Sequence, residues 1–143
     1  MAYENNEQNA FFLEDDTSNE YKYYWNKILS EYIVNKPRNC NCLTFFNSNV
    51  ELTKKMIASK NVYVNNYYHN WHSGTCCYFM TRNAIEIIYT YYIKNEKINI
   101  SNITNRLSLL ADVGLIYPLL NTYHICEPTF IDSFGKGKNS YVV

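Results

Sequence analysis

Three consecutive carboxylates, Glu14, Asp15 and Asp16, are the residues of this sequence with the clearest potential for chemistry. They directly follow the apolar run AFFL at positions 10–13, whose aromatic and branched side chains are typical of a buried strand. Because adjacent anions repel one another and are costly to bury unpaired, the strand must end at a wet or metal-occupied position. Mg²⁺ and Mn²⁺ take oxygen ligands and often join protein carboxylates to substrate phosphates. The run therefore predicts a cation site, although a solvated acidic turn explains the same residues.

A second segment, GTCCYFMTRNA at residues 74–84, has the order expected of a strand that leads into a helix. Gly74 lacks a side chain, so backbone or ligand can approach closely just before the strand Thr75 to Met80. Thr81 is a suitable N-cap for a helix from Arg82 to about Lys94.

With FFLEDD at residues 11–16 and GTCCYFMTRNA at 74–84, the chain resembles the family 25 glycosyltransferases, the lipopolysaccharide and procollagen galactosyltransferase type. FFLEDD is similar to the LEDD element of that family, and the second segment is similar to its GT-x-x-Y strand-to-helix segment. A looser match is Ala111-Asp112 with the Tyr-Pro segment after it, which resembles the late Asp element of the family. The three matches follow the order of the family.

The resemblance implies an α/β fold, a partial GT-A-like domain with a mixed sheet flanked by helices. It implies transfer of a sugar from a nucleotide-diphospho-sugar, in particular a UDP-sugar, to a hydroxyl acceptor on protein or glycan, as in lipopolysaccharide biosynthesis. The carboxylates Glu14 to Asp16 would bind this donor together with Gly74 and Thr75. Mn²⁺ or Mg²⁺ would neutralise the diphosphate leaving group.

By the same resemblance, the metal ligands are Glu14 and Asp16, with His124 as a late addition from the far end of the chain. Asp112 would accept the proton of the attacking hydroxyl or hold the acceptor in place. Two of these residues have structural alternatives. Asp112 suits the first turn of a helix, where the backbone dipole favours a carboxylate, and His124 suits a buried position bonded to backbone.

The alternative function is a truncated, non-catalytic domain that binds a partner or acts as a scaffold. In the family, the LEDD element lies well inside the domain, after an upstream nucleotide-binding part, whereas here it starts near residue 10. The sequence therefore resembles the back portion of such a domain, and whether this portion is an active enzyme stays open.

Length and charge limit the classes of protein that fit. A chain of 143 residues with 47% hydrophobic composition suits one domain, residues 1–143, with flexible ends at 1–9 and 135–143. Lys plus Arg and Asp plus Glu both number 13, and this balance argues against nucleic-acid binding, which needs a basic surplus. The abundance of Asn, Tyr, Ile and Lys indicates an AT-rich genome, such as that of a large DNA virus or a protist.

The five cysteines, an odd number with near-adjacent pairs, favour reduced thiols in a cytoplasmic compartment. The spacing of Cys40, Cys42, Cys76 and Cys77 is poor for a zinc module, so we interpret them as small core residues. No apolar run reaches the length of a membrane span, and the first residues lack the basic character of a signal peptide.

The apolar patterns predict strands at 11–13, 43–46 and 75–80 in one mixed sheet, with helices 18–34 and 82–94 packed on it. Thr17 with Glu20 would cap the first helix. Weaker patterns predict a helix within 50–59, an edge strand within 62–68, a short helix at 112–120 and an extended segment at 122–131. Because ligands collect at the carboxyl ends of strands, Gly74 and Asp112 should line one cleft with Asp16.

Overall fold

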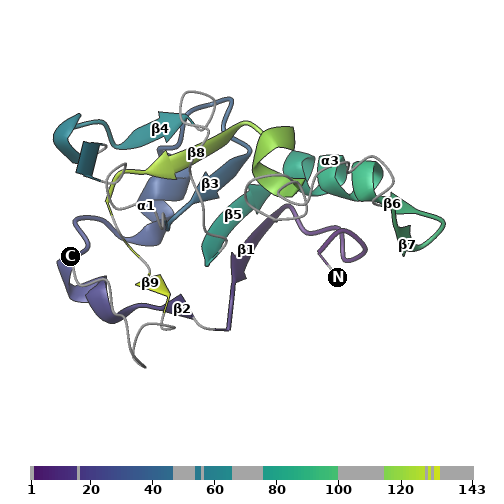
Figure 1. Cartoon of the computed structure of the whole chain (residues 1–143), viewed down its shortest axis with the longest axis horizontal. Helices are drawn as coiled ribbons and strands as arrows, with labels where there is room; N and C mark the ends of the chain where they lie inside the picture. Colours follow the sequence, from purple (N-terminus) through teal and green to yellow (C-terminus); the bar gives the residue numbers. More distant parts are fainter. Residues whose placement is uncertain are drawn as a thin grey trace.

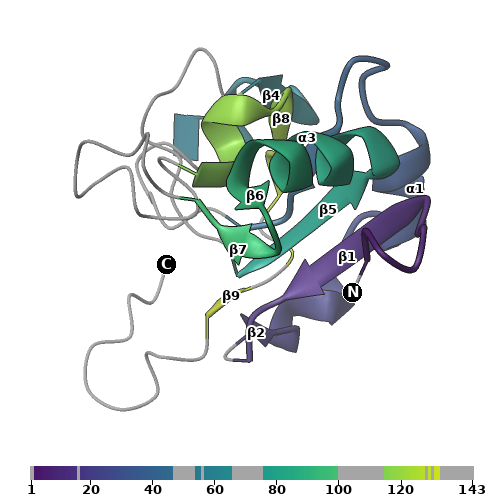
Figure 2. The same cartoon turned by 90° about the vertical axis from the view of Figure 1, so that its right-hand side faces the viewer.

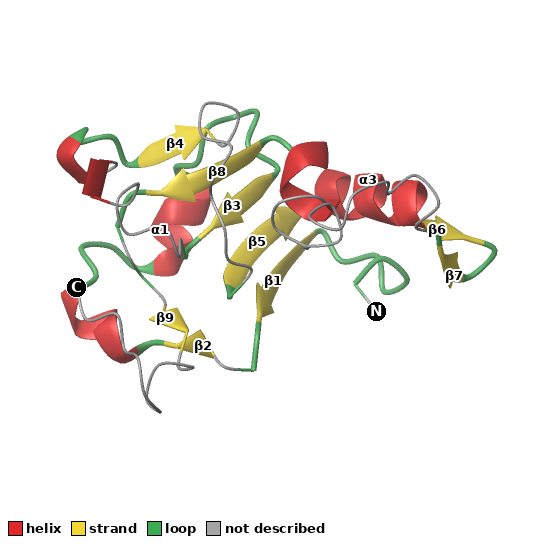
Figure 3. Cartoon of the chain, in the orientation of Figure 1, coloured by secondary structure: helices red, strands yellow, loops and turns green. Residues whose placement is uncertain are grey.

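The computed structural model describes residues 2–15, 17–46, 54–55, 57–65, 76–99, 115–127, 129 and 131–132. Within these ranges the chain forms a five-stranded mixed sheet in the order β1-β5-β3-β8-β4 (Figures 1 and 3). Its strands are β1 (Asn9–Leu13), β3 (Cys42–Thr44), β4 (Tyr63–Asn65), β5 (Cys77–Thr81) and β8 (Thr122–Ile125). The predicted mixed sheet is confirmed, and its three predicted strands correspond to β1, β3 and β5.

The strand directions bring several segments together at one end of the sheet. β3 is parallel to β8 and antiparallel to β5, and β5 is antiparallel to β1, so β1, β3 and β8 all run the same way. We call the end where these three strands finish the carboxyl end of the sheet. β5 begins at this end, since Leu13 lies opposite Cys77. Segments far apart in the sequence therefore meet there.

Helix α3 (Arg82–Tyr92) follows β5 directly, and the predicted cap is confirmed because the Thr81 side chain accepts the Ala84 N–H. The prediction extended this helix to residue 94, but it ends at Tyr92. The chain then forms a short hairpin of β6 (Ile93–Lys94) and β7 (Lys97–Ile98). Its turn places Asn95 and Glu96 at positive φ, as a two-residue hairpin turn requires.

The predicted continuous helix 18–34 is wrong. Thr17–Ser18 instead form β2, which pairs with β9 (Ile131–Asp132), followed by the 3-10 helix η1 (Glu20–Tyr24) and α1 (Leu29–Val34). Contacts to distant segments explain the break. The Thr17 hydroxyl donates to the Cys76 carbonyl at 2.6 Å rather than capping a helix, and the Trp25 indole N–H donates to the Thr129 carbonyl at 2.8 Å.

The weaker predictions are met in part within the described ranges. Residues 54–55 and 57–58 are helical, β4 is an edge strand, and residues 115–120 form a tight turn that includes the 3-10 helix η5 (Tyr117–Leu119). The extended segment contains β8. Residues 2–6 form turns, and Tyr3 stacks on Tyr89 of α3 with ring centroids 3.7 Å apart.

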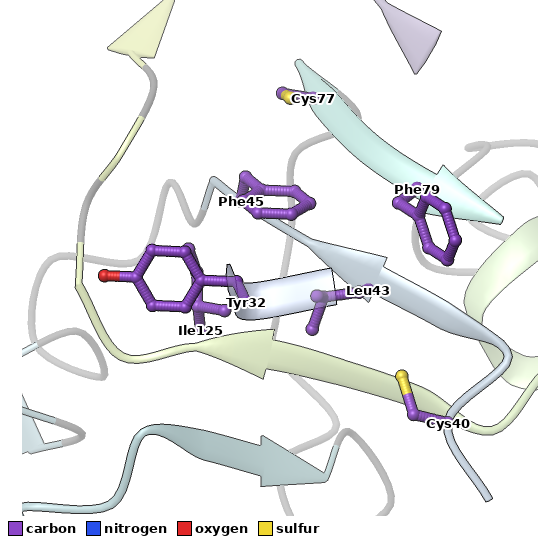
Figure 4. Close-up of a cluster of buried hydrophobic side chains, with 7 residues drawn as sticks. All are labelled: Tyr32, Cys40, Leu43, Phe45, Cys77, Phe79 and Ile125. Carbon is purple, nitrogen blue, oxygen red and sulfur yellow. The ribbon is translucent and has the colours of Figure 1, made fainter. Parts of the chain in front are cut away.

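Helices α1 and α3 lie on opposite faces of the sheet (Figure 2), and we name these faces after them. The core of the α1 face is almost wholly apolar and is drawn in Figure 4: Tyr32, Cys40, Leu43, Phe45, Cys77, Phe79 and Ile125. The core of the α3 face consists of Cys42, Met80, Ala84, Ile85, Tyr117 and Leu120. Among the helices of the described ranges, none is both long enough and apolar enough to cross a bilayer.

Candidate active site

The acidic element lies where the sequence predicted it, at the carboxyl end of the sheet. Glu14 and Asp15 directly follow β1, and both side chains are exposed to solvent. Asp16 lies outside the described residues. The apolar strand therefore delivers at least two adjacent carboxylates to a wet position, as a hard cation would require.

A set of hydrogen bonds joins this turn to the start of β5. The Glu14 N–H donates to the Cys76 carbonyl at 3.0 Å, and the same carbonyl accepts from the Thr17 hydroxyl. The Thr17 N–H closes the turn by donating to the Glu14 carbonyl at 3.1 Å. The FFLEDD and GTCCYFMTRNA segments are thus bonded neighbours, although about sixty residues separate them. Gly74 and Thr75, which immediately precede Cys76, lie outside the described residues.

A row of side chains crosses the α3 face beside Glu14. The strand register aligns Phe12, Tyr78, Thr44 and His124 on neighbouring strands. The rings of Phe12 and Tyr78 stack with centroids 4.9 Å apart. Because strand side chains alternate between faces, Glu14 points to the same face as Phe12.

The Tyr78 hydroxyl in this row is harder to ionise than that of an exposed tyrosine. Burial, followed by the neighbouring Cys42 and Glu14, raises the pKa of Tyr78 to about 12. Its hydroxyl therefore stays neutral at physiological pH.

His124 lies on β8, an interior strand between β3 and β4, with 1% of its surface exposed. Its Nδ1 forms a hydrogen bond with the Thr44 hydroxyl, and the ring of Tyr117 meets it edge-on at 5.8 Å. The sequence offered two interpretations, a metal ligand or a buried histidine bonded to backbone. The bonded partner of Nδ1 is a side chain of the neighbouring strand.

The structure does not bring His124 and Glu14 together. Both residues lie on the α3 face, but β5 and β3 separate their strands. With about 4.8 Å between neighbouring strands, β1 and β8 lie roughly 14 Å apart. A cation held at about 2.0–2.6 Å by each ligand is not positioned to use both side chains.

Asp112 also lies outside the described residues, so the predicted proximity of Asp16 and Asp112 stays a prediction. The nearest described segment, which begins at Leu115, is tied to α3 by the Tyr92 hydroxyl, which donates to the Leu115 carbonyl at 2.8 Å. Within the described ranges, no three His, Cys, Asp or Glu side chains come together as a metal site.

Sequence reasoning missed another acidic residue at this end of the sheet. Glu127 follows β8, and its carboxylate accepts a hydrogen bond from the hydroxyl of Tyr32 on α1. Burial, followed by this bond to Glu127, raises the pKa of Tyr32. A single Glu before a proline carries no local sign of such a contact, because its partner lies 95 residues away.

The five cysteines are free and buried, as their interpretation as core residues predicts. Burial raises the pKa of Cys40 and of Cys126 to about 11, and it also raises the pKa values of Cys42 and Cys77. Since the thiolate is the form that attacks substrates or binds metals, burial opposes both roles at neutral pH.

Comparison of the chain with known protein families, with curated proteins and with solved structures finds no match. The functional interpretation therefore depends on the sequence motifs and on the geometry described above.

Proposed function

We propose that this chain is a glycosyltransferase-like domain of the family 25 type. It would transfer a sugar from a nucleotide-diphospho-sugar, with a UDP-sugar as the first candidate, to a hydroxyl acceptor on a protein or glycan. In this proposal the five-stranded sheet is part of a GT-A-like domain, and the substrate site lies at the carboxyl end of the sheet.

One observation carries the proposal. The acidic turn after β1 is hydrogen-bonded to the residue before β5, through the Glu14 N–H and the Cys76 carbonyl. The two segments that resemble the family therefore share one location. This location is the end of the sheet where open α/β folds bind ligands.

The donor atoms available there suit a hard cation. Glu14 and Asp15 are exposed, adjacent carboxylates, and Mg²⁺ or Mn²⁺ is commonly held by one or two carboxylates together with substrate phosphates. Glu14 and Asp16 are the proposed ligands, and the bound cation would stabilise the charge of the departing diphosphate. Asp112 is the proposed acceptor-side carboxylate.

Of the two roles that the sequence allowed for His124, we favour the buried, hydrogen-bonded one. Its buried position and its bond to Thr44 favour a contribution to the internal order of β3 and β8. We therefore assign the metal to the acidic turn alone.

A binding domain without turnover is the second candidate. The observation that favours it is that, among the strands in the described part of the chain, β1 pairs with β5 alone and so lies at an edge of the sheet. The two functions differ in whether a nucleotide and a metal bind at the acidic turn.

The test is a thermal titration with millimolar Mn²⁺ and uridine diphosphate. A ligand that binds only the folded state at about ten times its dissociation constant stabilises the fold by about 1.4 kcal/mol. For a domain of this size we expect the melting temperature to rise by about 3–6 °C. Glu14→Gln and Asp16→Asn should each abolish the rise, while their melting temperatures without ligand stay within about 2 °C of the wild type.

The matched control is Glu96→Gln, which neutralises an exposed carboxylate in the β6–β7 turn. This variant should keep the full rise. If the wild type and Asp16→Asn melt identically with and without both ligands, the metal and nucleotide site is not present, and the binding-domain function replaces the transferase.

A further inference from the structure

The acidic turn at Glu14 to Asp16 is followed directly by β2, which pairs with a distant segment of the chain. In this antiparallel pairing, Thr17 lies opposite Asp132 and Ser18 lies opposite Ile131 of β9 (Figure 1). Within the described part of the chain, the pairing covers two residue pairs, and isolated two-stranded ribbons are at best marginally stable in water. The position of β2 therefore depends on what holds β9.

Two residues shortly before β9 bond to other elements of the α1 face. The Glu127 carboxylate accepts a hydrogen bond from the Tyr32 hydroxyl of α1. Thr129 makes two further bonds, since its hydroxyl donates to the Phe45 carbonyl at 2.8 Å and its carbonyl accepts from the Trp25 indole N–H at 2.8 Å. We call these three bonds the anchor of β9, because they fix the chain directly before this strand begins.

Tyr32 is well placed to fix this position. Its side chain is fully buried, and its ring meets that of Phe45 edge-on with centroids 6.4 Å apart. The hydroxyl points out of the apolar cluster, toward the segment that follows β8 (Figure 4). Burial, followed by the bond to Glu127, raises the pKa of Tyr32, so the hydroxyl keeps the proton that it donates. Because hydrogen bonds to charged acceptors are the stronger class, we expect the Tyr32–Glu127 bond to be the strongest of the three.

The acidic turn is held from two sides. On one side the Cys76 carbonyl accepts from the Glu14 N–H and from the Thr17 hydroxyl. On the other side β2 leaves the turn and pairs with β9, which the anchor holds. Fixing a chain close to a second contact lowers the entropy that is lost when this contact forms. The anchor therefore favours the β2–β9 pairing and, through it, one arrangement of the turn.

We propose that Tyr32 and Glu127 are positioning residues for the acidic turn. Their hydrogen bond holds β9 beside β2, and this pairing keeps Glu14 and Asp15 in the arrangement that binds the divalent cation. The effect on the order of the turn is independent of any ligand, whereas the effect on the cation rests on the proposed function. Two separate experiments therefore test the two effects.

The first experiment measures the order of the turn in the full chain without metal. Amide hydrogen exchange, followed by nuclear magnetic resonance, reports local opening at the Glu14 and Thr17 N–H groups, which are both hydrogen-bonded in the turn. Tyr32→Phe keeps the buried ring and removes the hydroxyl, so the variant should fold. Exchange at both amides should become at least about fivefold faster, as expected for the loss of one hydrogen bond.

Tyr63→Phe is the matched control. The Tyr63 hydroxyl on β4 donates to the backbone carbonyl of Tyr32 at 2.9 Å. The control therefore removes a hydrogen bond from the same residue of α1 and leaves the anchor intact. Exchange at Glu14 and Thr17 should stay within about twofold of the wild type.

Two substitutions of Glu127 separate the hydrogen bond from general packing. Glu127→Gln keeps an oxygen that accepts from Tyr32, whereas Glu127→Ala removes the acceptor. Exchange at the turn should be close to that of the wild type in the first variant and fast in the second. Adding Tyr32→Phe to Glu127→Ala should change little more, because either substitution alone already breaks the bond.

The second experiment measures Mn²⁺ binding by electron paramagnetic resonance, in which the signal of the free ion falls as it binds. The temperature is kept well below melting, so that a change in stability alone does not alter the result. Tyr32→Phe and Glu127→Ala should raise the dissociation constant at least about threefold, because a loosely held site binds its metal less tightly. Glu127→Gln and Tyr63→Phe should leave it within about twofold of the wild type.

Different results would overturn the two parts of the proposal. Unchanged exchange at the turn in folded Tyr32→Phe, or equally fast exchange in Tyr63→Phe, would overturn the positioning of the turn. Faster exchange with an unchanged dissociation constant would overturn the effect on the cation. If the wild type binds no Mn²⁺, the proposed cation site itself fails, and the exchange rates still decide whether Tyr32 and Glu127 order the turn.

Discussion

The two faces of the sheet differ in what they bury. The α1 face is filled mainly by aromatic, aliphatic and thiol side chains, with the buried Thr129 bonded to the Phe45 carbonyl at 2.8 Å. The α3 face carries three buried polar residues in the sheet itself, Thr44, Thr122 and His124. Buried polar groups cost free energy unless they are hydrogen-bonded. Here the Thr44 hydroxyl meets His124, and the Thr122 hydroxyl donates to the Tyr117 carbonyl at 3.2 Å.

The difference indicates that the two faces of the sheet contribute differently to the protein, and we refer to it as the division between the faces. The residues that β3 and β5 direct to the α1 face are apolar side chains and a thiol. The α3 face combines a bonded polar pair with Tyr78 and the adjacent Glu14, so it is the face toward which we place the proposed substrate site. Three predictions test this division, beginning with the largest expected effect.

Phe45→Ala should disrupt the packing of the α1 face and destabilise the fold. Phe45 is fully buried and contacts the rings of Phe11 and Tyr32. Truncation of a buried phenylalanine leaves a cavity and costs about 3–5 kcal/mol in the free energy of unfolding. Urea denaturation measures the loss. Tyr23→Ala, which truncates an aromatic ring that is 83% exposed, should change the stability by less than about 0.5 kcal/mol.

On the α3 face, the expected effect is smaller and comes from a broken polar pair. His124→Phe leaves the Thr44 hydroxyl without its partner, and Thr44→Val does the same to His124 Nδ1. Each change should cost about 1–3 kcal/mol. The double variant should recover part of this loss, because replacement of both partners by apolar groups leaves neither unsatisfied. Strictly additive losses in a double-mutant cycle would show that the two side chains do not stabilise each other.

The smallest effect is a difference in alkaline pH dependence between the faces. On the α1 face, burial raises the pKa of Cys40 from 9.0 to about 11, and on the α3 face the pKa of Tyr78 rises from 10.0 to about 12. Above the ordinary pKa, the unfolded chain loses its proton before the folded chain does, so stability falls with rising pH. The contribution of Cys40 is complete below pH 9 and is lost toward pH 11, and that of Tyr78 is lost about one pH unit later.

Cys40→Ala should therefore reduce the loss of stability that begins near pH 9, and Tyr78→Phe should reduce only the loss that begins near pH 10. Urea denaturation over an alkaline pH series measures both. Curves for the two variants that run parallel to the wild type would show that neither group titrates differently in the folded and unfolded states.

The sequence alone determined the elements whose causes are local. The apolar run before Glu14 predicts β1, and Thr81 followed by a helical stripe predicts α3 and its first residue. The exposed position of Glu14 and Asp15 follows from the cost of burying adjacent charges. These parts of the fold and of the candidate site depend on neighbouring residues, which a sequence displays directly.

Only the tertiary structure decided which of these elements meet. β8 lies between β3 and β4, although β3 and β4 precede it in the chain. The helix expected at 18–34 is interrupted because Thr17 and Trp25 bond to carbonyls 59 and 104 residues away. The position of His124 beside Thr44, rather than beside Glu14, likewise follows from strand order. Such bonds form between residues that only the folded chain brings together, so no local pattern in the sequence specifies them.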